Sequence, residues 1–355
     1  MKKFTITAAE SGQHAVKYIK HLLPKAQNGF LHKMMRKKNI TVNGKKTDGS
    51  SILSEGDEVC IWFSDETFEN LGGGTVVSGD RRDDDLYGKL LSHDARAVMQ
   101  KTNDSAADRM ADRIIYEDDQ IILYNKPAGQ LSQKATATDV SANEILLDYL
   151  REQGTMPAGF VPSVCNRLDR NTSGLLLFAK SHGAAKALQE LLKEREASKY
   201  YLAPVSGVIK EPQLLRAWWG KDEKSNTAII RNKAFEGSKE IITGIRPLSD
   251  NGEVTLLEIE LITGKSHQIR AHLSSIGHPI IGDPKYGKKG QSPKSGASVK
   301  RQLLHAYRMA FPEHLEGALK NLSGKEFIAP LPEDLEKYLT ACGINMVDDI
   351  SRNLY

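Results

Sequence analysis

The sequence is poor in cysteine and contains no long apolar run. Its three cysteines (Cys60, Cys165 and Cys342) are widely separated and odd in number, which argues against a disulfide framework or a zinc cluster. No apolar stretch approaches the roughly 20 residues of a membrane span, and no apolar block of a secretory signal follows the two N-terminal lysines. We therefore expect a cytoplasmic protein with reduced thiols and no membrane partner.

Cofactor and metal signatures are also missing. The sequence has neither the GxGxxG nor the GxxxxGK[ST] pattern of nucleotide-binding loops. Three histidines lie close together (His267, His272 and His278), but they lack the i, i+4 spacing of a helical metal site, and no cysteine joins them. The sequence predicts neither a cofactor nor a metal.

The 355 residues are 39% hydrophobic and 26% charged, which is ordinary for a globular protein long enough for two domains. The net charge is only +4, but it is unevenly distributed. Residues 1–63 carry 11 Lys and Arg against 5 Asp and Glu, whereas residues 64–113 carry 7 against 11. The positive charge is therefore concentrated at the front of the chain.

Residues 1–63 show the pattern of a small basic domain. Apolar spacing predicts helices over His14–Leu23 and Phe30–Lys38, and Ile40–Val42 runs into an Asn43-Gly44 hairpin turn, with a further strand at Val59–Phe63. The basic side chains left for the outer surface are Lys33, Arg36, Lys37, Lys38, Lys45 and Lys46. Such a charge run is either a solvated face or a surface for a phosphate backbone.

Residues 64–113 read as an acidic, glycine-containing linker with at most a marginal helix near 86–101. Residues 114–340 alternate short apolar strands with helices, and 341–355 form a tail. The predicted strands are Ile114–Tyr124, Leu175–Ala179, Lys199–Val208 and Val254–Ile262; the predicted helices are Ser141–Gln153, Ala184–Arg195 and one capped by Ser266. The basic stretch Lys285–Arg301 looks like a mobile insertion.

The stretch Val164–Lys180 (VCNRLDRNTSGLLLFAK) places Asp169 between Arg167 and Arg170, on a loop before a buried strand. The two neighbouring guanidiniums would keep this carboxylate ionised and attract a polyanion. Asp169 is then either a nucleophile that works on a phosphate-bearing substrate or a loop aspartate in a salt bridge.

Five stretches resemble, in order, the motifs of the RluA/RluC/RluD-type pseudouridine synthases: IIYEDDQIILYNKPAG, RLDRNTSGLLLFAKS, KYYLAPVSG, GKSHQIRAHLSSIGHPIIGDPKYG and LLHAYRMAF. The resemblance implies an α+β fold with a central mixed, mainly antiparallel sheet flanked by helices. It also implies the isomerisation of uridine to pseudouridine in RNA without a cofactor. The carboxylate would either attack the anomeric carbon of the ribose or help to form a glycal intermediate.

By the same resemblance, Asp169 matches the catalytic nucleophile, Arg270 its ion-pair partner and Tyr201 the residue against the base. A strand tyrosine could otherwise be an ordinary core residue. Arg167 matches a residue that fills the space of the flipped base. Lys126 and His267 are predicted to contact phosphate or base edges, although Lys126 could equally be a solvated turn lysine.

The N-terminal segment resembles the αL RNA-binding domain of a small-subunit ribosomal protein, although its first helix begins SGQHAVKYI instead of with an Arg-Leu-Asp element. Its contacts to RNA would come from the basic residues named above. An αL domain in this position suggests ribosomal RNA, most often of the large subunit, as the target. We expect a monomer that binds RNA and not DNA.

Three positions depart from the family pattern: Asn166 replaces His, Lys265 replaces Arg and Ser266 replaces Thr. None of these changes removes Asp169, Tyr201 or Arg270. Two other functions compete with the synthase. One is an RNA-binding protein without catalysis, and the other is a nucleoside hydrolase, which would need a second carboxylate such as Glu260 or Asp283.

Overall fold

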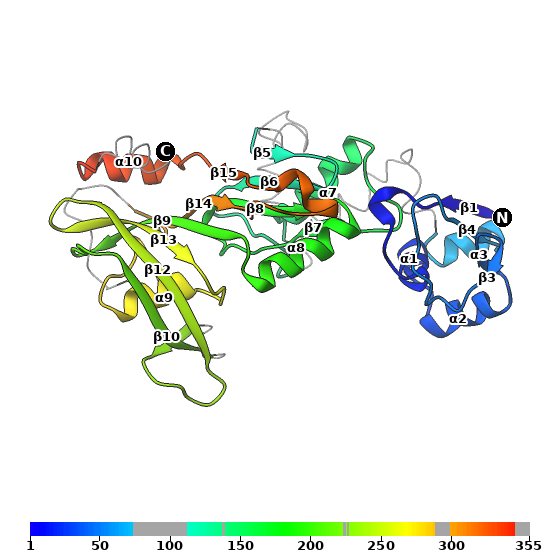
Figure 1. Ribbon diagram of the computed structural model, residues 1–355, viewed down its shortest axis with the longest axis horizontal. Coiled ribbons are helices and arrows are strands. Elements are labelled where there is room, and N and C mark those ends of the chain that lie inside the picture. The colour runs from blue at the N-terminus through cyan, green and yellow to red at the C-terminus, as the bar shows by residue number, and fades with distance from the viewer. Residues whose placement is uncertain (74–111, 137–138, 223–224, 226, 288–298, 345–355) are drawn as a thin grey trace.

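The computed structural model describes residues 1–73, 112–136, 139–222, 225, 227–287 and 299–344. The molecule is elongated, with a small N-terminal domain at one end and a long twisted sheet that reaches the other end (Figure 1). The helix predicted near 86–101 and most of the predicted tail lie outside the described residues. Where the chain is described, it has no helix long and apolar enough to cross a membrane.

The N-terminal domain is a four-stranded antiparallel sheet covered by helices, with strand order β1-β4-β2-β3. Asn43 and Gly44 both have positive φ angles, 50° and 70°, as the predicted Asn-Gly hairpin turn requires. The two predicted helices and this hairpin are confirmed. The elements are β1 (Lys2–Thr5), η1 (Ala8–Glu10), α1 (Ala15–Leu22), α2 (Asn28–Arg36), β2 (Ile40–Val42), β3 (Lys45–Lys46) and β4 (Glu58–Ile61).

The compact N-terminal unit continues past residue 63, where we expected the linker to begin. Helix α3 (Asp65–Asn70) follows, and the Ser64 hydroxyl caps it by accepting a hydrogen bond from the Thr67 N–H. Phe68 of α3 is buried in the same apolar core as α1 and α2. A charge count could not reveal this helix, because a single buried aromatic ring holds it to the domain.

The second domain is built on an 11-stranded sheet with the order β11-β10-β12-β13-β9-β14-β8-β6-β5, to which β15 and β7 add at β14 and β8. Within the described residues only the β8–β14 pair is parallel, so the mixed, mainly antiparallel sheet is confirmed. The strands are β5 (Ile114–Glu117), β6 (Ile121–Lys126), β7 (Ser163–Val164), β8 (Ser173–Ala179), β9 (Ser198–Ser206), β10 (Gln213–Asp222), β11 (Thr227–Arg231), β12 (Lys239–Asp250), β13 (Val254–Leu261), β14 (His305–Ala310) and β15 (Glu326–Ile328).

Both faces of the central strands are covered, and β8 is buried along its whole length, which explains its apolar run from Leu175 to Ala179. Leu176 and Phe178 face a core completed by α7 (Ala142–Glu152) and α9 (Gln268–Ser275). Leu175 and Leu177 face the opposite core, formed by α8 (His182–Glu194) and η2 (Gly317–Leu322). A last helix, α10 (Glu333–Ala341), packs Leu335, Tyr338 and Leu339 against the end of β13.

Strand β8 begins at Ser173 and Gly174, where it approaches β14 very closely. Gly174 has a φ of 112°, and a Cβ atom built on it would lie 2.1 Å from the Ala306 carbonyl oxygen. Only glycine fits this position. The strand that follows the Asp169 loop is thereby anchored in the middle of the sheet.

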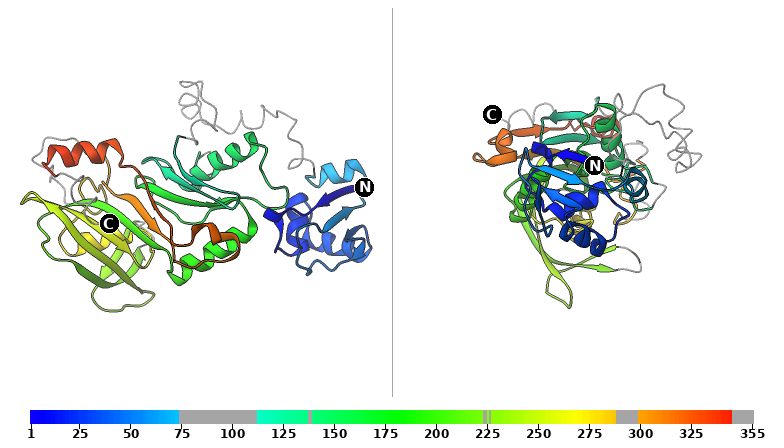
Figure 2. Two further views of the ribbon diagram at one scale, coloured as in Figure 1. Left: turned by 45° about the horizontal axis from the view of Figure 1, so that its top comes forward. Right: turned by 90° about the vertical axis from the view of Figure 1, so that its right-hand side faces the viewer.

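The two domains meet at the segment 158–160, which lies between α7 and β7. The buried Glu10 carboxylate accepts a hydrogen bond from the Gly159 N–H at 2.5 Å, and the Gly159 carbonyl accepts bonds from Gln13 Nε2 at 3.0 Å and His21 Nδ1 at 2.8 Å. Ala158 packs against the N-terminal core. In the left view of Figure 2 the N-terminal domain lies at one end of the molecule and adjoins the second domain there.

Candidate active site

Asp169 lies on the loop between β7 and β8, and the backbone on either side of it is bonded to other parts of the domain. The Ser132 hydroxyl is within 3.0 Å of both the N–H and the carbonyl of Leu168. The Arg170 carbonyl accepts bonds from the Gly129 N–H and from Lys126, and the Asn171 carbonyl accepts one from Arg301. A loop bonded at so many positions holds its side chains steadily.

Lys126 is one of these supports and not a phosphate contact, so that prediction is wrong. Its side chain is fully buried at the end of β6, and Nζ donates to the carbonyls of Pro127 (3.0 Å), Gln130 (2.8 Å) and Arg170 (3.1 Å). Burial lowers the pKa of Lys126 to about 7. The three carbonyls nevertheless favour the ammonium form, because only that form offers three N–H donors.

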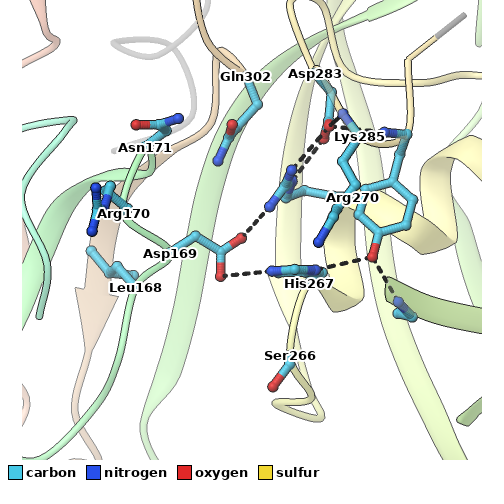
Figure 3. A network of polar contacts seen from close by, with 12 residues as sticks. Leu168, Asp169, Arg170, Asn171, Ser266, His267, Arg270, Asp283, Lys285 and Gln302 are labelled. Atoms are coloured by element: carbon cyan, nitrogen blue, oxygen red, sulfur yellow. Dashed lines mark hydrogen bonds and ion pairs between the residues drawn. The ribbon is translucent and has the colours of Figure 1, made fainter. Parts of the chain in front are cut away.

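The Asp169 carboxylate is oriented by Arg270 from helix α9. Asp169 Oδ2 accepts a hydrogen bond from Arg270 Nη1 at 2.7 Å. The same guanidinium donates to both oxygens of Asp283, from Nε at 2.7 Å and from Nη2 at 3.0 Å. Figure 3 shows Arg270 between the two carboxylates. The predicted pairing of Asp169 and Arg270 is thus observed.

Asp283 completes this arrangement as a buried anchor. Its side chain is 0% exposed, and Oδ1 also accepts the backbone N–H groups of Lys285 and Tyr286. Burial opposes the charge of Asp283, but the bonds and charge of Arg270 lower its pKa overall. In the same way, burial opposes the charge of Arg270, but Asp283 and then Asp169 raise its pKa overall. Both groups remain ionised.

His267 faces the other oxygen of Asp169. Its Nε2 lies 4.0 Å from Asp169 Oδ1 (Figure 3), and its Nδ1 is 3.0 Å from the Tyr286 hydroxyl. His267 is the N-cap residue of α9 and has a left-handed backbone with φ of 54°, which is uncommon outside glycine. The expectation that Ser266 caps this helix is therefore wrong. Burial lowers the pKa of His267, an effect that the charge of Asp169 opposes.

Tyr201 lies on β9 in the core beside the same site. It is 5% exposed and packs in the core that also contains Leu168, Ala306 and Ile269. Burial raises the pKa of its phenol, and the charge of Asp169 raises it further. Tyr201 is therefore a neutral phenol close to the Asp169 carboxylate.

Arg167 and Arg170 do not bind the carboxylate between them, contrary to the expectation from sequence. Both are exposed, and Figure 3 shows the Arg170 side chain turned away from Asp169. The Asn166 side chain, at the position where the family has His, bonds to the backbone of β8: Oδ1 accepts the Leu177 N–H and Nδ2 donates to the Leu175 carbonyl. Asn166 thus supports the loop.

The basic residues predicted in the N-terminal domain are all exposed, namely Lys33, Arg36, Lys37, Lys38, Lys45 and Lys46. Three of them, Arg36, Lys45 and Lys46, line a hollow of about 570 Å³ together with Asn43 and Ser51. The hollow lies between the end of α2 and the β2–β3 hairpin, and Asp48 is the one acidic residue in its lining.

Motif reading missed the roles of three residues in this site. The sequence suggests Asp283 only as a second acid, gives no signal for Tyr286 and places Arg301 in a mobile insertion. In the structure Arg301 is buried, and it donates to both carboxylate oxygens of Asp334 in α10 and to the carbonyl of Asn171 in the Asp169 loop. The residues 288–298 of that insertion lie outside the described part. Because a buried arginine needs an acidic partner, Asp334 is the residue that could have indicated from the sequence that Arg301 is buried.

The Asp169 carboxylate is open to a substrate and is held by buried partners. Asp169 is 27% exposed, so that a substrate can reach it, while its orienting partners are buried. Among the described residues no three His, Cys, Asp or Glu side chains come together as a metal site. An oriented carboxylate of this kind can act as a nucleophile or as a base.

Comparison with known proteins adds independent information. Residues 120–275 match a family described as RNA pseudouridylate synthase. The chain is 34% identical over 311 residues to the ribosomal large subunit pseudouridine synthase C of Rickettsia felis, covering 87% of this chain and 92% of that relative. Its identity to the protein of the same name from Escherichia coli is 28% over 352 residues, covering 96% of each.

A solved structure, the human RNA pseudouridylate synthase domain containing 4, shares the fold. It superposes with a TM-score of 0.56 at 21% sequence identity, covering 68% of this chain and 96% of the human chain.

Proposed function

The chain belongs to the RNA pseudouridine synthase family, and we propose that it modifies particular uridines of large-subunit ribosomal RNA. The isomerisation of uridine in RNA follows from the family. The choice of RNA is our proposal, and it is supported by relatives named for the large ribosomal subunit that align over nearly the whole chain.

The reaction breaks the N1–C1′ bond of uridine, turns the base and joins C5 to C1′, while the hydrogen of C5 is replaced by one on N1. No atoms are gained or lost. We propose that Asp169 is the nucleophile, that Arg270 holds its carboxylate and that the neutral Tyr201 phenol lies against the base. The target nucleotide must leave the RNA stack to reach these groups. The exposed Arg167 would then occupy the vacated space.

The observation that carries this proposal is the 2.7 Å contact between Asp169 and Arg270, which are 101 positions apart in the sequence. Arg270 already has two hydrogen bonds to Asp283 and is fixed before it meets Asp169. A preorganised guanidinium keeps the carboxylate ionised and aimed without further rearrangement.

We propose that the N-terminal domain binds the same RNA through its basic hollow. Each lysine or arginine that meets a phosphate adds affinity that is independent of sequence and weakens with salt. The alignment with the Escherichia coli relative covers 96% of this chain, so it includes most of this domain.

The hydrogen bonds of Asp283 argue against a nucleoside hydrolase that uses two carboxylates. Both oxygens of Asp283 are committed to Arg270 and to backbone N–H groups, which leaves no proton for a leaving group. Glu260 lies on β13, paired with Gly244 and Tyr200.

A binding protein without catalysis would not need a partly exposed carboxylate held by a buried ion pair.

The test is pseudouridine mapping on total RNA from cells that lack the gene, complemented with the wild type, Asp169→Asn or a surface control, Glu333→Gln. We expect the loss of one or a few sites in large-subunit ribosomal RNA, restored by wild type and by Glu333→Gln only. Restoration by Asp169→Asn would contradict the role of Asp169. Sites confined to another RNA would contradict the proposed substrate.

A further inference from the structure

The hydrogen bonds around His267 determine which of its ring nitrogens carries the proton. The Tyr286 hydroxyl oxygen is 2.7 Å from the backbone nitrogen of Ala228, whose N–H can only donate. The phenol proton is then available to His267 Nδ1 at 3.0 Å. With Nδ1 as an acceptor, the neutral ring carries its hydrogen on Nε2, and that N–H faces Asp169.

The two carboxylate oxygens of Asp169 also have different partners. Oδ2 is occupied by Arg270 at 2.7 Å, whereas Oδ1 faces His267 Nε2 at 4.0 Å. This distance is too long for a hydrogen bond. A donor and an acceptor that far apart can instead both bond one hydroxyl group placed between them, since a hydroxyl donates once and accepts as well.

The backbone at His267 is held in a conformation that a histidine does not adopt without support. Its φ of 54° lies in the left-handed region, which is strained for a residue with a side chain. Trp219 of β10 donates from its indole to the Ser266 carbonyl at 3.1 Å, and Gln268 fixes the turn by accepting the Lys265 N–H. Strands β10 and β11 thus both support the turn that aims this ring at Asp169.

We propose that His267 Nε2–H and Asp169 Oδ1 together bind the ribose 2′-hydroxyl of the target nucleotide. The inference rests on the proposed role of Asp169, because a carboxylate that acts at C1′ lies beside the adjacent C2′ and its hydroxyl. The hydroxyl would donate to Oδ1 and accept from Nε2–H. His267 therefore reads the sugar, not a phosphate, and discriminates RNA from DNA at the reacting nucleotide.

The test combines a change in the enzyme with a change in the substrate. Single-turnover rates at saturating enzyme are measured for wild type and His267→Ala on one RNA that carries either uridine or 2′-deoxyuridine at the target position. We expect the wild type to react at least about tenfold more slowly with 2′-deoxyuridine, as for a lost hydrogen bond to a charged group. His267→Ala should lose a similar factor on uridine, but little more on 2′-deoxyuridine.

Three further variants refine the test. His267→Gln can return an N–H to the place of Nε2 and should recover part of the preference for uridine. Tyr286→Phe removes the phenol that sets the tautomer and should weaken that preference. His314→Ala, an exposed histidine far from these contacts, should behave as wild type. RNA affinity is measured in parallel, and we expect His267→Ala to leave it within about twofold.

Each outcome bears on the proposal. The proposal would be overturned if His267→Ala and the 2′-deoxyuridine substitution lowered the rate by independent factors. It would also be overturned if His267→Ala weakened RNA binding at an unchanged rate, which would indicate a phosphate contact. A properly folded His267→Ala that keeps the full preference for uridine would also overturn it. Failure of the proposed function is distinguishable, because then wild type would convert no uridine, or Asp169→Asn would convert it as fast as wild type.

Discussion

Asp283 accepts two hydrogen bonds from Arg270, and so determines the direction from which the Arg270 guanidinium reaches Asp169. The Asp283 side chain is 0% exposed and that of Arg270 is 7% exposed. The ion pair therefore acts as a rigid bridge between the loop after α9, which carries Asp283, and the loop that carries Asp169. The stability and the activity of the enzyme should both depend on it.

We predict that Asp283→Asn lowers the free energy of unfolding by about 3–5 kcal/mol, because it leaves a buried guanidinium without its anchor. Denaturant unfolding followed by circular dichroism measures this change. The control is Glu333→Gln, which removes an exposed ion pair with Lys337 and should cost less than about 1 kcal/mol. Equal effects of the two variants would show that the Asp283 pair is not a structural anchor.

Lys126→Met should destabilise the fold without changing how RNA affinity depends on salt. The variant removes a donor from three carbonyls, of which only that of Arg170 keeps another bond within the described residues, from the Gly129 N–H. We expect a loss of at least about 2 kcal/mol. In contrast, Lys45→Ala on the exposed hairpin should reduce the salt slope of RNA binding by about one. If a folded Lys126→Met variant showed a reduced salt dependence of RNA affinity, Lys126 would contact a phosphate, as the sequence predicted.

Stability should fall in mild acid because two histidines are buried in the neutral form. Burial lowers the pKa of His305 and of His272 to about 4, below the unfolded value of about 6.5. Between these values the unfolded chain binds protons that the folded protein does not, so the free energy of unfolding decreases as pH falls from about 6.5 to 4.

The contribution of His305 can be isolated by substitution. His305 binds Ser173 through Nδ1 and the Ala329 carbonyl through Nε2, and Arg301 and Asp334 are the charged groups nearby. His305→Gln should make the pH slope shallower by up to about 1.4 kcal/mol per pH unit. Urea titrations from pH 4 to 8 measure the slope, and the exposed His314→Gln should leave it unchanged.

Gly159→Ala should separate the N-terminal domain from the catalytic domain. A Cβ atom at this position would lie 1.9 Å from the Tyr18 ring. We expect a larger maximum dimension in small-angle X-ray scattering and roughly tenfold weaker RNA binding, since two linked sites lose their fixed geometry. Gly183→Ala is the control, because its Cβ would meet only Ala318 at 3.7 Å. Unchanged scattering by Gly159→Ala would show that the domains are held by other contacts.

Sequence patterns predicted the elements whose apolar residues recur with the period of a helix or form a short buried run. Strand β8, buried on both faces, and the amphipathic α1 and α7 were found by their periodicity, and the family motifs brought Asp169 and Arg270 together. The same motifs identified the family that the relatives confirm.

The parts that escaped prediction depend on contacts between distant residues. Strands β10 and β11 have mixed burial and gave no usable pattern. The sequence suggested a phosphate contact or a solvated turn lysine for Lys126, because its acceptor at Arg170 lies 44 positions away. Charge proximity in sequence was also misleading, since Arg170 flanks Asp169 but the side chain that binds it is Arg270.

The contact between Glu10 and Gly159 has a consequence for the choice of target. Because Gly159 leads into the loop that carries Asp169, the basic hollow and Asp169 are set a fixed distance apart by the protein itself. If the hollow binds the RNA backbone, as we propose, a target uridine must lie at that distance from a stretch of backbone. The folded shape of the RNA would then help to determine which uridine is modified.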